Sequence, residues 1–113
     1  MRNPDLLRIT VEHVEEALLV RVAGEVDIST VAELRRQVRA ACRGRGTVLL
    51  DLADVGFMDS SGLHVLLEAS DGAAMSDSPF FIVRPSSAVQ RLLDATGTCA
   101  ELPVVEPNEH VLR

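Results

Sequence analysis

TVLLDLADVGFMDSSGLHVLL, residues 47–67, is the stretch that decides the fold. Its first part, Thr47–Leu52, is a short apolar run with one acid, which is typical of a central strand buried on both faces. Residues 53–59 predict a short loop, and from about Ser60 apolar residues recur at helical spacing, which predicts a helix. The buried face of this helix is predicted at Leu63, Leu66, Leu67, Ser70 and Ala74. A buried strand that leads into a helix indicates an α/β fold.

The segment before this stretch predicts two further strands. Residues 7–11 alternate apolar and polar side chains, and residues 17–22 form a more fully apolar run that ends at Gly24. Glu15 and Glu16 fit a hairpin turn, and so short a connection makes the two strands antiparallel.

A loop and a helix are predicted after the hairpin. GEVDIST, residues 24–30, predicts the loop, and Thr30 with Glu33 has the spacing of a capping box. The buried face of the helix is predicted at Val31, Leu34, Val38 and Ala41. Gly44 and Gly46 are expected to end it. The arginines of this segment are interpreted as a solvated surface, with a basic partner-binding strip as the alternative.

The remaining segments continue the alternation of strands and helices. Residues 80–83 predict a buried strand, and Ser87 with Gln90 predicts the capped start of a third helix that ends at Gly97. Residues 102–105 predict a last strand at the edge of the sheet, because their proline lacks the N–H that a central strand needs.

These segments predict a single domain over residues 1–113, a length that fits one core. The core is expected at about 6–105, and 106–113 is expected to be a tail or a short terminal helix. The predicted fold is α/β, with a mixed β-sheet of about five strands that opens on an antiparallel hairpin and is covered by three to four helices.

The composition narrows the classes of partner. The net charge is −6, aromatic residues are 3% and neither Trp nor Tyr occurs, so nucleic acid and anionic membranes are poor partners. No run approaches the ~18 apolar residues of a membrane span, and the N-terminus lacks the apolar region of a signal peptide. Cys42 and Cys99 are interpreted as reduced thiols of a cytoplasmic protein, with a disulfide or redox switch as the alternative. No histidine and cysteine cluster has metal-ligand spacing.

DSSG, residues 59–62, follows a buried strand and begins a helix, which is where α/β sheets gather function. The simplest role is an N-cap, with Phe57 and Met58 anchored in or beside the core. Gly62 suggests more, because glycine in a helix costs about 1 kcal/mol relative to alanine and invites a reason such as close approach by another backbone. If one serine caps, the other is exposed at the positive helix end, where a phosphate is tolerated and would repel a partner.

GEVDIST (24–30) with the helix after it, LLDLADVGFMDSSGLHVLL (49–67) and VQRLLDATG (89–97) together resemble the STAS domain, and more narrowly the bacterial anti-sigma factor antagonists. The resemblance covers nearly the whole chain. It implies a partner, an anti-sigma factor with a histidine-kinase-like ATPase fold, from which the unphosphorylated antagonist frees a sigma factor. It also implies that this anti-sigma factor is a serine kinase whose action ends the binding, and that a metal-dependent serine phosphatase restores it.

The resemblance assigns expected roles to individual residues. Ser60, directly after the Asp of DSSG, is the expected phosphorylation site. The expected partner interface comprises Asp27, Asp59, Ser61, Gly62 and His64. His64 departs from the family, in which a small residue is common one turn into this helix, and this departure leaves the partner's identity open. ATP and metal belong to the partner, so no cofactor or metal is expected here.

Two other functions are weighed. Ser60 and His64 share a helix face, but no G-x-S-x-G motif is present and neighbours at i, i+4 rarely give triad geometry, so no catalytic activity is expected. Some STAS domains are not phosphorylated and serve as subunits of transporters or as scaffolds of sensory complexes. This alternative stays open, although the intact DSSG and the solitary domain favour the switch.

Overall fold

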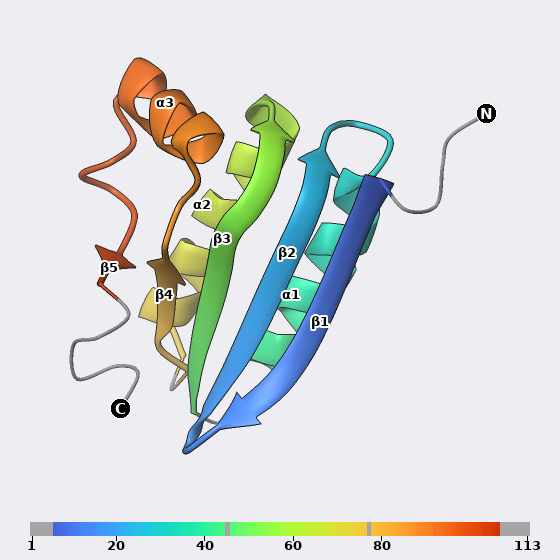
Figure 1. The fold of residues 1–113 in the computed structure, drawn as a ribbon. Coiled ribbons are helices and arrows are strands. Elements are labelled where there is room, and N and C mark those ends of the chain that lie inside the picture. Colours follow the sequence, from blue (N-terminus) through green and yellow to red (C-terminus); the bar gives the residue numbers. More distant parts are fainter. Residues whose placement is uncertain (1–5, 45, 77, 107–113) are drawn as a thin grey trace.

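The computed structural model describes residues 6–44, 46–76 and 78–106, which form a five-stranded sheet and three helices (Figure 1). The elements in chain order are β1 (Leu7–Val14), β2 (Ala17–Val26), α1 (Val31–Cys42), β3 (Thr47–Met58), α2 (Ser60–Ala74), β4 (Phe80–Val83), α3 (Ser87–Thr96) and β5 (Val104–Val105). The sheet order is β1-β2-β3-β4-β5, with β1 antiparallel to β2 and the other neighbours parallel. The predicted α/β fold with a mixed sheet and an opening hairpin is confirmed.

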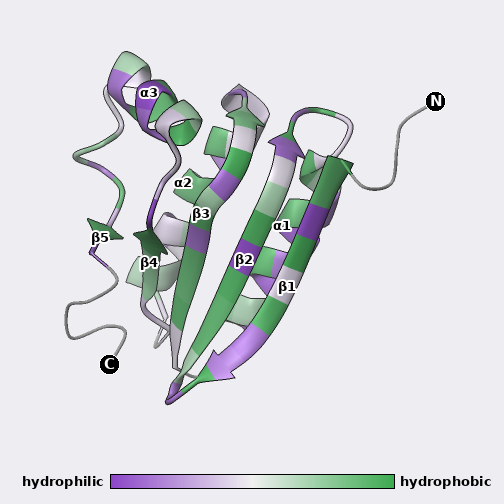
Figure 2. Cartoon of the chain, in the orientation of Figure 1, coloured by the Kyte–Doolittle hydropathy of each residue, from purple (hydrophilic) through white to green (hydrophobic). Residues whose placement is uncertain are grey.

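The main core lies between the sheet and the two helices α1 and α2, which pack side by side behind the strands (Figure 1). Most of β2 and β3 and the whole of β4 are apolar, and a hydrophilic band interrupts β2 and β3 near the middle of each strand (Figure 2). Fully buried core side chains include Val20, Val22, Leu34, Leu50, Leu52 and Leu66. Each such side chain contributes roughly 1.5–3 kcal/mol when it leaves water, so this layer holds the helices in place.

β2 and β3 are both longer than the sequence predicts. Residues 24–26 belong to β2 and residues 53–58 to β3, so the loops predicted there are wrong. The physical reason is that β3 carries one extra residue opposite Arg21–Ala23 and another opposite Gly24–Glu25. Each such bulge interrupts the alternation of buried and exposed side chains, and the period-two pattern of a strand is lost.

Gly24 lies inside β2 and does not end it. Its φ is +111°, and a Cβ atom there would lie 2.0 Å from the carbonyl oxygen of Leu6. Only glycine tolerates both the positive φ and this close approach of the chain entering β1.

The capping box predicted at Thr30 and Glu33 is wrong. Thr30 stands at the N-cap of α1 but its side chain makes no capping hydrogen bond. Its hydroxyl instead donates to the carbonyl oxygen of Glu25 at 2.9 Å and accepts from the N–H of Asp27 at 2.9 Å. Glu33 pairs with Arg36 at 2.6 Å on the exposed side of the helix. The hydroxyl therefore closes the loop between β2 and α1.

The start of α3 lies one residue earlier than the predicted cap. Ser86, and not Ser87, is the N-cap, and its hydroxyl accepts from the N–H of Val89 at 3.2 Å. Gly97 ends the helix in the left-handed conformation, as predicted. β5 is shorter than predicted, at Val104–Val105, and it lies at the edge of the sheet beside β4. Beyond residue 106, the predicted tail lies outside the described residues.

The buried face of α2 differs in part from the prediction. Leu63 and Leu66 are buried as expected, whereas Ala74 is exposed and Val65 is buried. Val65 is buried because it faces α1 across the groove between the two helices. None of the helices that the structure describes is long and apolar enough to span a membrane.

Candidate functional site

The ends of β2 and β3 bring two acidic loops together. Val26 and Met58 pair as the last residues of the two parallel strands, and the N–H of Asp59 donates to the carbonyl oxygen of Val26 at 3.2 Å. Asp27 and Asp59 therefore leave neighbouring strands at the C-terminal edge of the sheet (Figure 1). We call residues 27–30 and 59–64 together the Ser60 corner.

Asp59 caps α2, a role that the sequence left open between the aspartate and the serines of DSSG. Its extended backbone places the carboxylate over the first turn, where Oδ1 accepts from the N–H of Ser61 at 2.9 Å. The Ser61 hydroxyl donates to the same oxygen. One carboxylate thus satisfies a free N–H of the helix end and also occupies the Ser61 hydroxyl.

Ser60 is the first residue of α2 and is exposed. Within the described part of the chain, no hydrogen bond involves its hydroxyl, in contrast to that of Ser61. The two serines of DSSG are therefore not equivalent, and the free hydroxyl is the one that the sequence analysis singled out.

Gly62 is buried beneath this turn. A Cβ atom there would lie 2.6 Å from Cγ of Met58 and 2.8 Å from Cγ1 of Val26. The close approach that the sequence suggested is real, but side chains make it and not a backbone. Gly62 lets the first turn of α2 settle on the ends of β2 and β3, and so it fixes the position of Ser60.

Asp27 organises the loop at the other side of the corner. Its Oδ1 accepts from the N–H of Ser29 at 2.9 Å and from the Ser29 hydroxyl at 2.7 Å. Its carbonyl oxygen accepts from the N–H groups of Thr30 and Val31 at 3.0 and 2.8 Å. Ile28 lies in this compact turn, and its side chain is 79% exposed.

Two large apolar side chains are exposed in or next to the Ser60 corner, and the sequence did not predict the exposure of either. Ile28 projects from the loop after β2, and Phe57 on β3 is 48% exposed, so the prediction that Phe57 is anchored in or beside the core is wrong. The β3 bulge next to Phe57 is the cause, because it shifts which residues face the helices. The sequence did hold a signal for Ile28, because it is an isoleucine among the polar residues 27–30.

His64 is exposed on α2, one turn after Ser60. No hydrogen bond joins His64 to Ser60 among the described residues. The nucleophile–base contact on which a serine hydrolase depends is therefore not formed. Within the same residues, no group of three His, Cys, Asp or Glu side chains could hold a metal ion.

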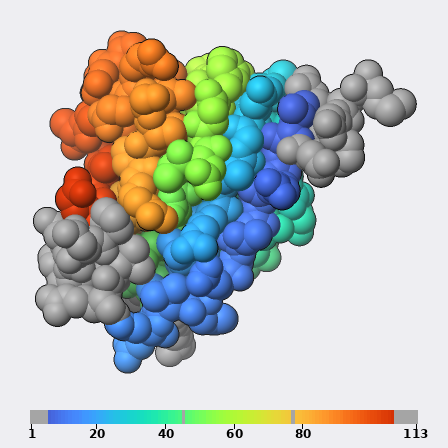
Figure 3. Space-filling view, in the orientation of Figure 1, coloured from blue at the N-terminus to red at the C-terminus, as the bar shows by residue number. Residues whose placement is uncertain are grey.

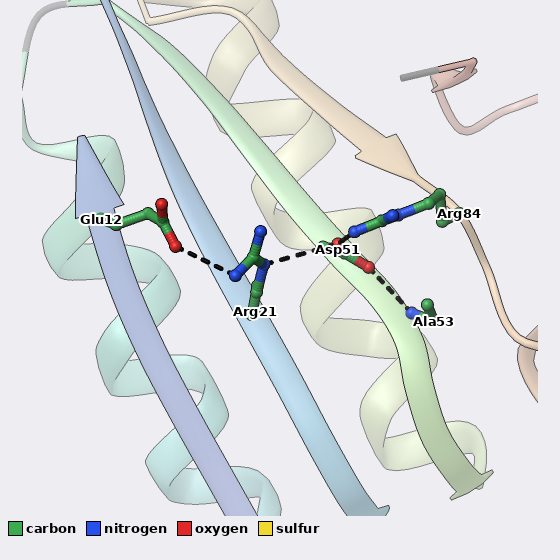
Figure 4. A network of polar contacts seen from close by, with 5 residues as sticks. All are labelled: Glu12, Arg21, Asp51, Ala53 and Arg84. Atoms are coloured by element: carbon green, nitrogen blue, oxygen red, sulfur yellow. Dashed lines mark hydrogen bonds and ion pairs between the residues drawn. The ribbon is translucent and has the colours of Figure 1, made fainter. Parts of the chain in front are cut away.

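The sheet face turned away from α1 and α2, which Figure 3 shows as a space-filling view, carries a second polar cluster (Figure 4). The buried Asp51 accepts from Arg84 and from the N–H of Ala53 at 3.0 Å, and Arg21, which also pairs with Glu12 at 3.1 Å, approaches it at 3.9 Å. The hydrogen bond to Asp51 raises the pKa of Arg84. Because the carboxylate is fully paired, this cluster is structural, and it ties β2, β3 and the end of β4 together.

The comparisons with known proteins agree on one family. The model of the STAS domain matches residues 8–111. An anti-sigma F factor antagonist of Paenibacillus polymyxa is 32% identical over 108 residues, which are 94% of this chain and 92% of that protein. An anti-sigma-B factor antagonist of Staphylococcus epidermidis is 38% identical over 80 residues, 69% of this chain and 73% of that protein. The crystal structure of an anti-sigma factor antagonist from Mycobacterium paratuberculosis matches with a TM-score of 0.80 and 26% identity, over 92% of this chain and 89% of that one. The chain belongs to the STAS-domain family.

Proposed function

We propose that this chain is an anti-sigma factor antagonist, that it binds an anti-sigma factor through the Ser60 corner, and that phosphorylation of Ser60 ends the binding. The observation that carries the proposal is the difference between the two serines, since Ser61 is bound to Asp59 and Ser60 is exposed with no partner in the described chain. The names of the similar proteins supply the class of partner.

The unphosphorylated corner has the composition of a protein-binding surface. Ile28 within the corner and Phe57 next to it provide apolar contacts, and apolar side chains that become buried dominate the energy of most interfaces. Asp27 and Asp59 contribute two carboxylates, and they directly follow the paired last residues of β2 and β3. A partner surface with an apolar pocket beside a cation or several N–H donors complements this arrangement.

Phosphorylation requires a partner that supplies ATP, and the anti-sigma factor acts as this kinase in the proposal. The Ser60 oxygen attacks the γ-phosphorus of ATP, the bond from that phosphorus to the β–γ bridging oxygen breaks, and ADP leaves. The hydroxyl proton passes to a base of the kinase. A serine phosphatase later hydrolyses the phosphoserine to serine and inorganic phosphate, and the chain can bind again.

The phosphate changes the charge of the corner without a need to unfold it. It adds about −1.5 to −2 charges at the N-terminus of α2, where the helix dipole favours an anion. The corner contains no lysine or arginine to pair with it, and Asp59 precedes it directly. A bound anti-sigma factor therefore meets added bulk and like charge at the centre of the interface, which costs several kcal/mol.

The experiment is a pull-down from lysate of the source organism with three immobilised variants, Ser60→Ala, Ser60→Asp and Ser87→Asp. Ser87 is the matched control, because it is also an exposed serine and the first residue of its helix. ATP or ADP is added, and the bound proteins are identified by mass spectrometry. Phosphorylation of the wild-type chain is mapped in the same lysate.

Ser60→Ala and Ser87→Asp are expected to retain a kinase of the ATPase fold, and Ser60→Asp is expected to lose it. Phosphate is expected on Ser60 of the wild-type chain. If all three baits retain the same proteins and Ser60 carries no phosphate, the switch is refuted. The chain is then better described as a constitutive STAS subunit of a larger complex.

A further inference from the structure

A groove runs between α1 and α2, from Val65 toward the end of α2 that lies away from Ser60. Its volume is about 540 Å³, within the range of about 300–1,000 Å³ that ligand sites occupy. Its floor is apolar, with Val38 and Val65 buried and Ala69 and Ala73 half-buried. None of the residues that carry the proposed switch lines it.

The rim of this groove is positively charged in a chain whose net charge is −6. Arg35, Arg39 and Arg43 follow one another along α1 at four-residue steps, which places them on one side of the helix. Glu68 of α2 pairs with Arg35 at 3.2 Å and, more weakly, with Arg39 at 3.9 Å. Arg43 makes no ion pair or side-chain hydrogen bond with any described residue. Positive charge is therefore left over at the Arg39–Arg43 end.

The side chains that α2 contributes to the groove are small at Ala69, Gly72 and Ala73. A Cβ atom at Gly72 would find no atom of the described residues within 4 Å, so no packing contact in that part of the chain requires glycine there. Glycine within a helix nevertheless costs about 1 kcal/mol relative to alanine. Together with the alanines of the floor, Gly72 leaves room for another backbone to approach α2 closely.

We propose that this groove binds an amphipathic helix of a partner protein, with small apolar residues on one face and Asp or Glu beside it. The carboxylates of this helix pair with Arg39 and Arg43, and its apolar face covers Val38, Val65 and Ala69. Along α2 the groove extends from Val65 to Ala73, roughly 12 Å at ~1.5 Å per residue, and its lining continues to Ser76 beyond the helix. A guest helix of about three turns fits this length.

A second copy of this chain is a poorer occupant. α1 is rich in arginine and α2 already forms one wall, so α3 is the remaining described helix that could enter. α3 carries one arginine and one aspartate, Arg91 and Asp94, and offers no excess of negative charge to the rim.

The groove is separate from the proposed switch. The groove and the Ser60 corner share no residue, although Val65 of the groove directly follows His64 of the corner. From Val65 the groove extends along α2 to Ala73, which is 13 residues or about 20 Å from Ser60. The acidic helix therefore binds whether or not Ser60 carries a phosphate, and the inference goes beyond the proposed function.

The two cysteines provide a direct readout. Cys42 lines the groove and is partly buried, and burial raises the pKa of its thiol, whereas Cys99 is exposed and lies outside the groove. The probes are two synthetic helical peptides of about three turns, with identical Leu/Ala faces and either Glu or Lys on the other face. The rate of alkylation of each cysteine by iodoacetamide is followed by mass spectrometry.

The Glu peptide is expected to slow alkylation of Cys42 at least about fivefold and to leave Cys99 unchanged, with the effect weakened by high salt because the rim is exposed. Arg39→Glu and Arg43→Glu are expected to lose this protection, whereas Arg91→Glu on α3 keeps it. Gly72→Leu adds bulk to the wall of the groove at a position where a Cβ atom meets no described atom within 4 Å. It is expected to block the peptide while the fold, checked by circular dichroism, is kept.

Three results would overturn the proposal. One is equal protection by the Glu and Lys peptides, or by neither. Another is protection of Cys42 that grows with the concentration of the chain alone, which indicates a second copy. The third is equal protection by decanoate, which indicates a site for a small amphipathic anion. The pull-down on Ser60 variants does not bear on any of these results, so the two proposals fail separately.

Discussion

α2 and α3 begin in the same way: an N-cap side chain accepts a hydrogen bond from the first turn, and an exposed serine is the first helical residue. In α2 these residues are Asp59 and Ser60, and in α3 they are Ser86 and Ser87. Both caps satisfy N–H groups that have no partner within the helix. The local structure of the two helix starts therefore does not distinguish Ser60 from Ser87 as a site for a phosphate.

The surroundings of the two helix starts differ. The Ser86 hydroxyl also donates to the carbonyl oxygen of Val55 at 2.6 Å, which fastens α3 to β3. Asp59 instead brings a charge to the surface beside the loop of Asp27. The large apolar side chains exposed among the described residues are Val11, Ile28, Phe57 and Met75, and none of them belongs to α3 or its cap. The neighbouring charged and exposed apolar side chains, and not the helix start itself, make Ser60 the candidate switch.

The largest effect is expected from moving a negative charge between the two helix starts. Ser60→Asp is expected to weaken binding to the anti-sigma factor about 100-fold, or nearly 3 kcal/mol, because the charge lies at the proposed interface. Ser87→Asp is expected to leave the affinity unchanged. Isothermal titration calorimetry with the purified partner measures both. Equal weakening by the two substitutions would show that net charge, and not position, controls binding.

The next effect concerns how the start of α2 is seated. Gly62→Ala is expected to destabilise the chain by about 1–3 kcal/mol, because the new methyl group overlaps Met58 and the stiff side chain of Val26 in a buried site. Gly72→Ala, in the same helix, is expected to stabilise it by up to about 1 kcal/mol, since no atom of the described residues lies within 4 Å of the new methyl group. Urea unfolding monitored by circular dichroism gives both values. The same sign for both would refute the packing described for Gly62.

A smaller effect is expected from the apolar edge of the Ser60 corner. Ile28→Ala is expected to weaken partner binding about tenfold, or about 1.4 kcal/mol, with the stability within about 0.5 kcal/mol of wild type because the side chain is already exposed. Met75→Ala is the matched control, since Met75 is 89% exposed and follows the other end of α2. If both substitutions weaken binding alike, the interface is not centred on the corner.

The element order, the sheet class and the position of Ser60 could be predicted from the sequence, because they rest on apolar periodicity and on the run Thr47–Leu52. The second half of β3 could not, since its two bulges break the alternation that identifies a strand. The exposure of Phe57 follows from the same bulges and was missed with them.

Other details of the site depend on competition between near-equal local choices. Ser86 and Ser87 are both good caps, and only the carbonyl oxygen of Val55 on β3 selects the first. Asp59 prevails over the serines because its extended backbone comes directly from the end of β3. The steric need for Gly62 involves Val26, which is far away in the sequence, so the residue could be noticed but not explained.

The smallest effects separate the two tasks of Asp59. Asp59→Ala removes the cap and is expected to cost about 1 kcal/mol of stability. Ser86→Ala at the start of α3 is expected to cost more, because it removes the cap and also the hydrogen bond to Val55. Asp59→Asn keeps an oxygen that caps well and is expected to change stability by only a few tenths of a kcal/mol. Urea unfolding of the three variants measures these differences.

Partner binding then distinguishes the helix starts. Asp59→Asn removes the charge without the cap, so weakened binding with unchanged stability assigns the carboxylate to the interface. Ser86→Ala is expected to lower stability and leave the affinity of the folded chain unchanged. If Asp59→Asn binds as well as wild type, the carboxylate of Asp59 only starts the helix, as Ser86 does. The difference between α2 and α3 would then rest on Ser60, Asp27 and the exposed apolar side chains alone.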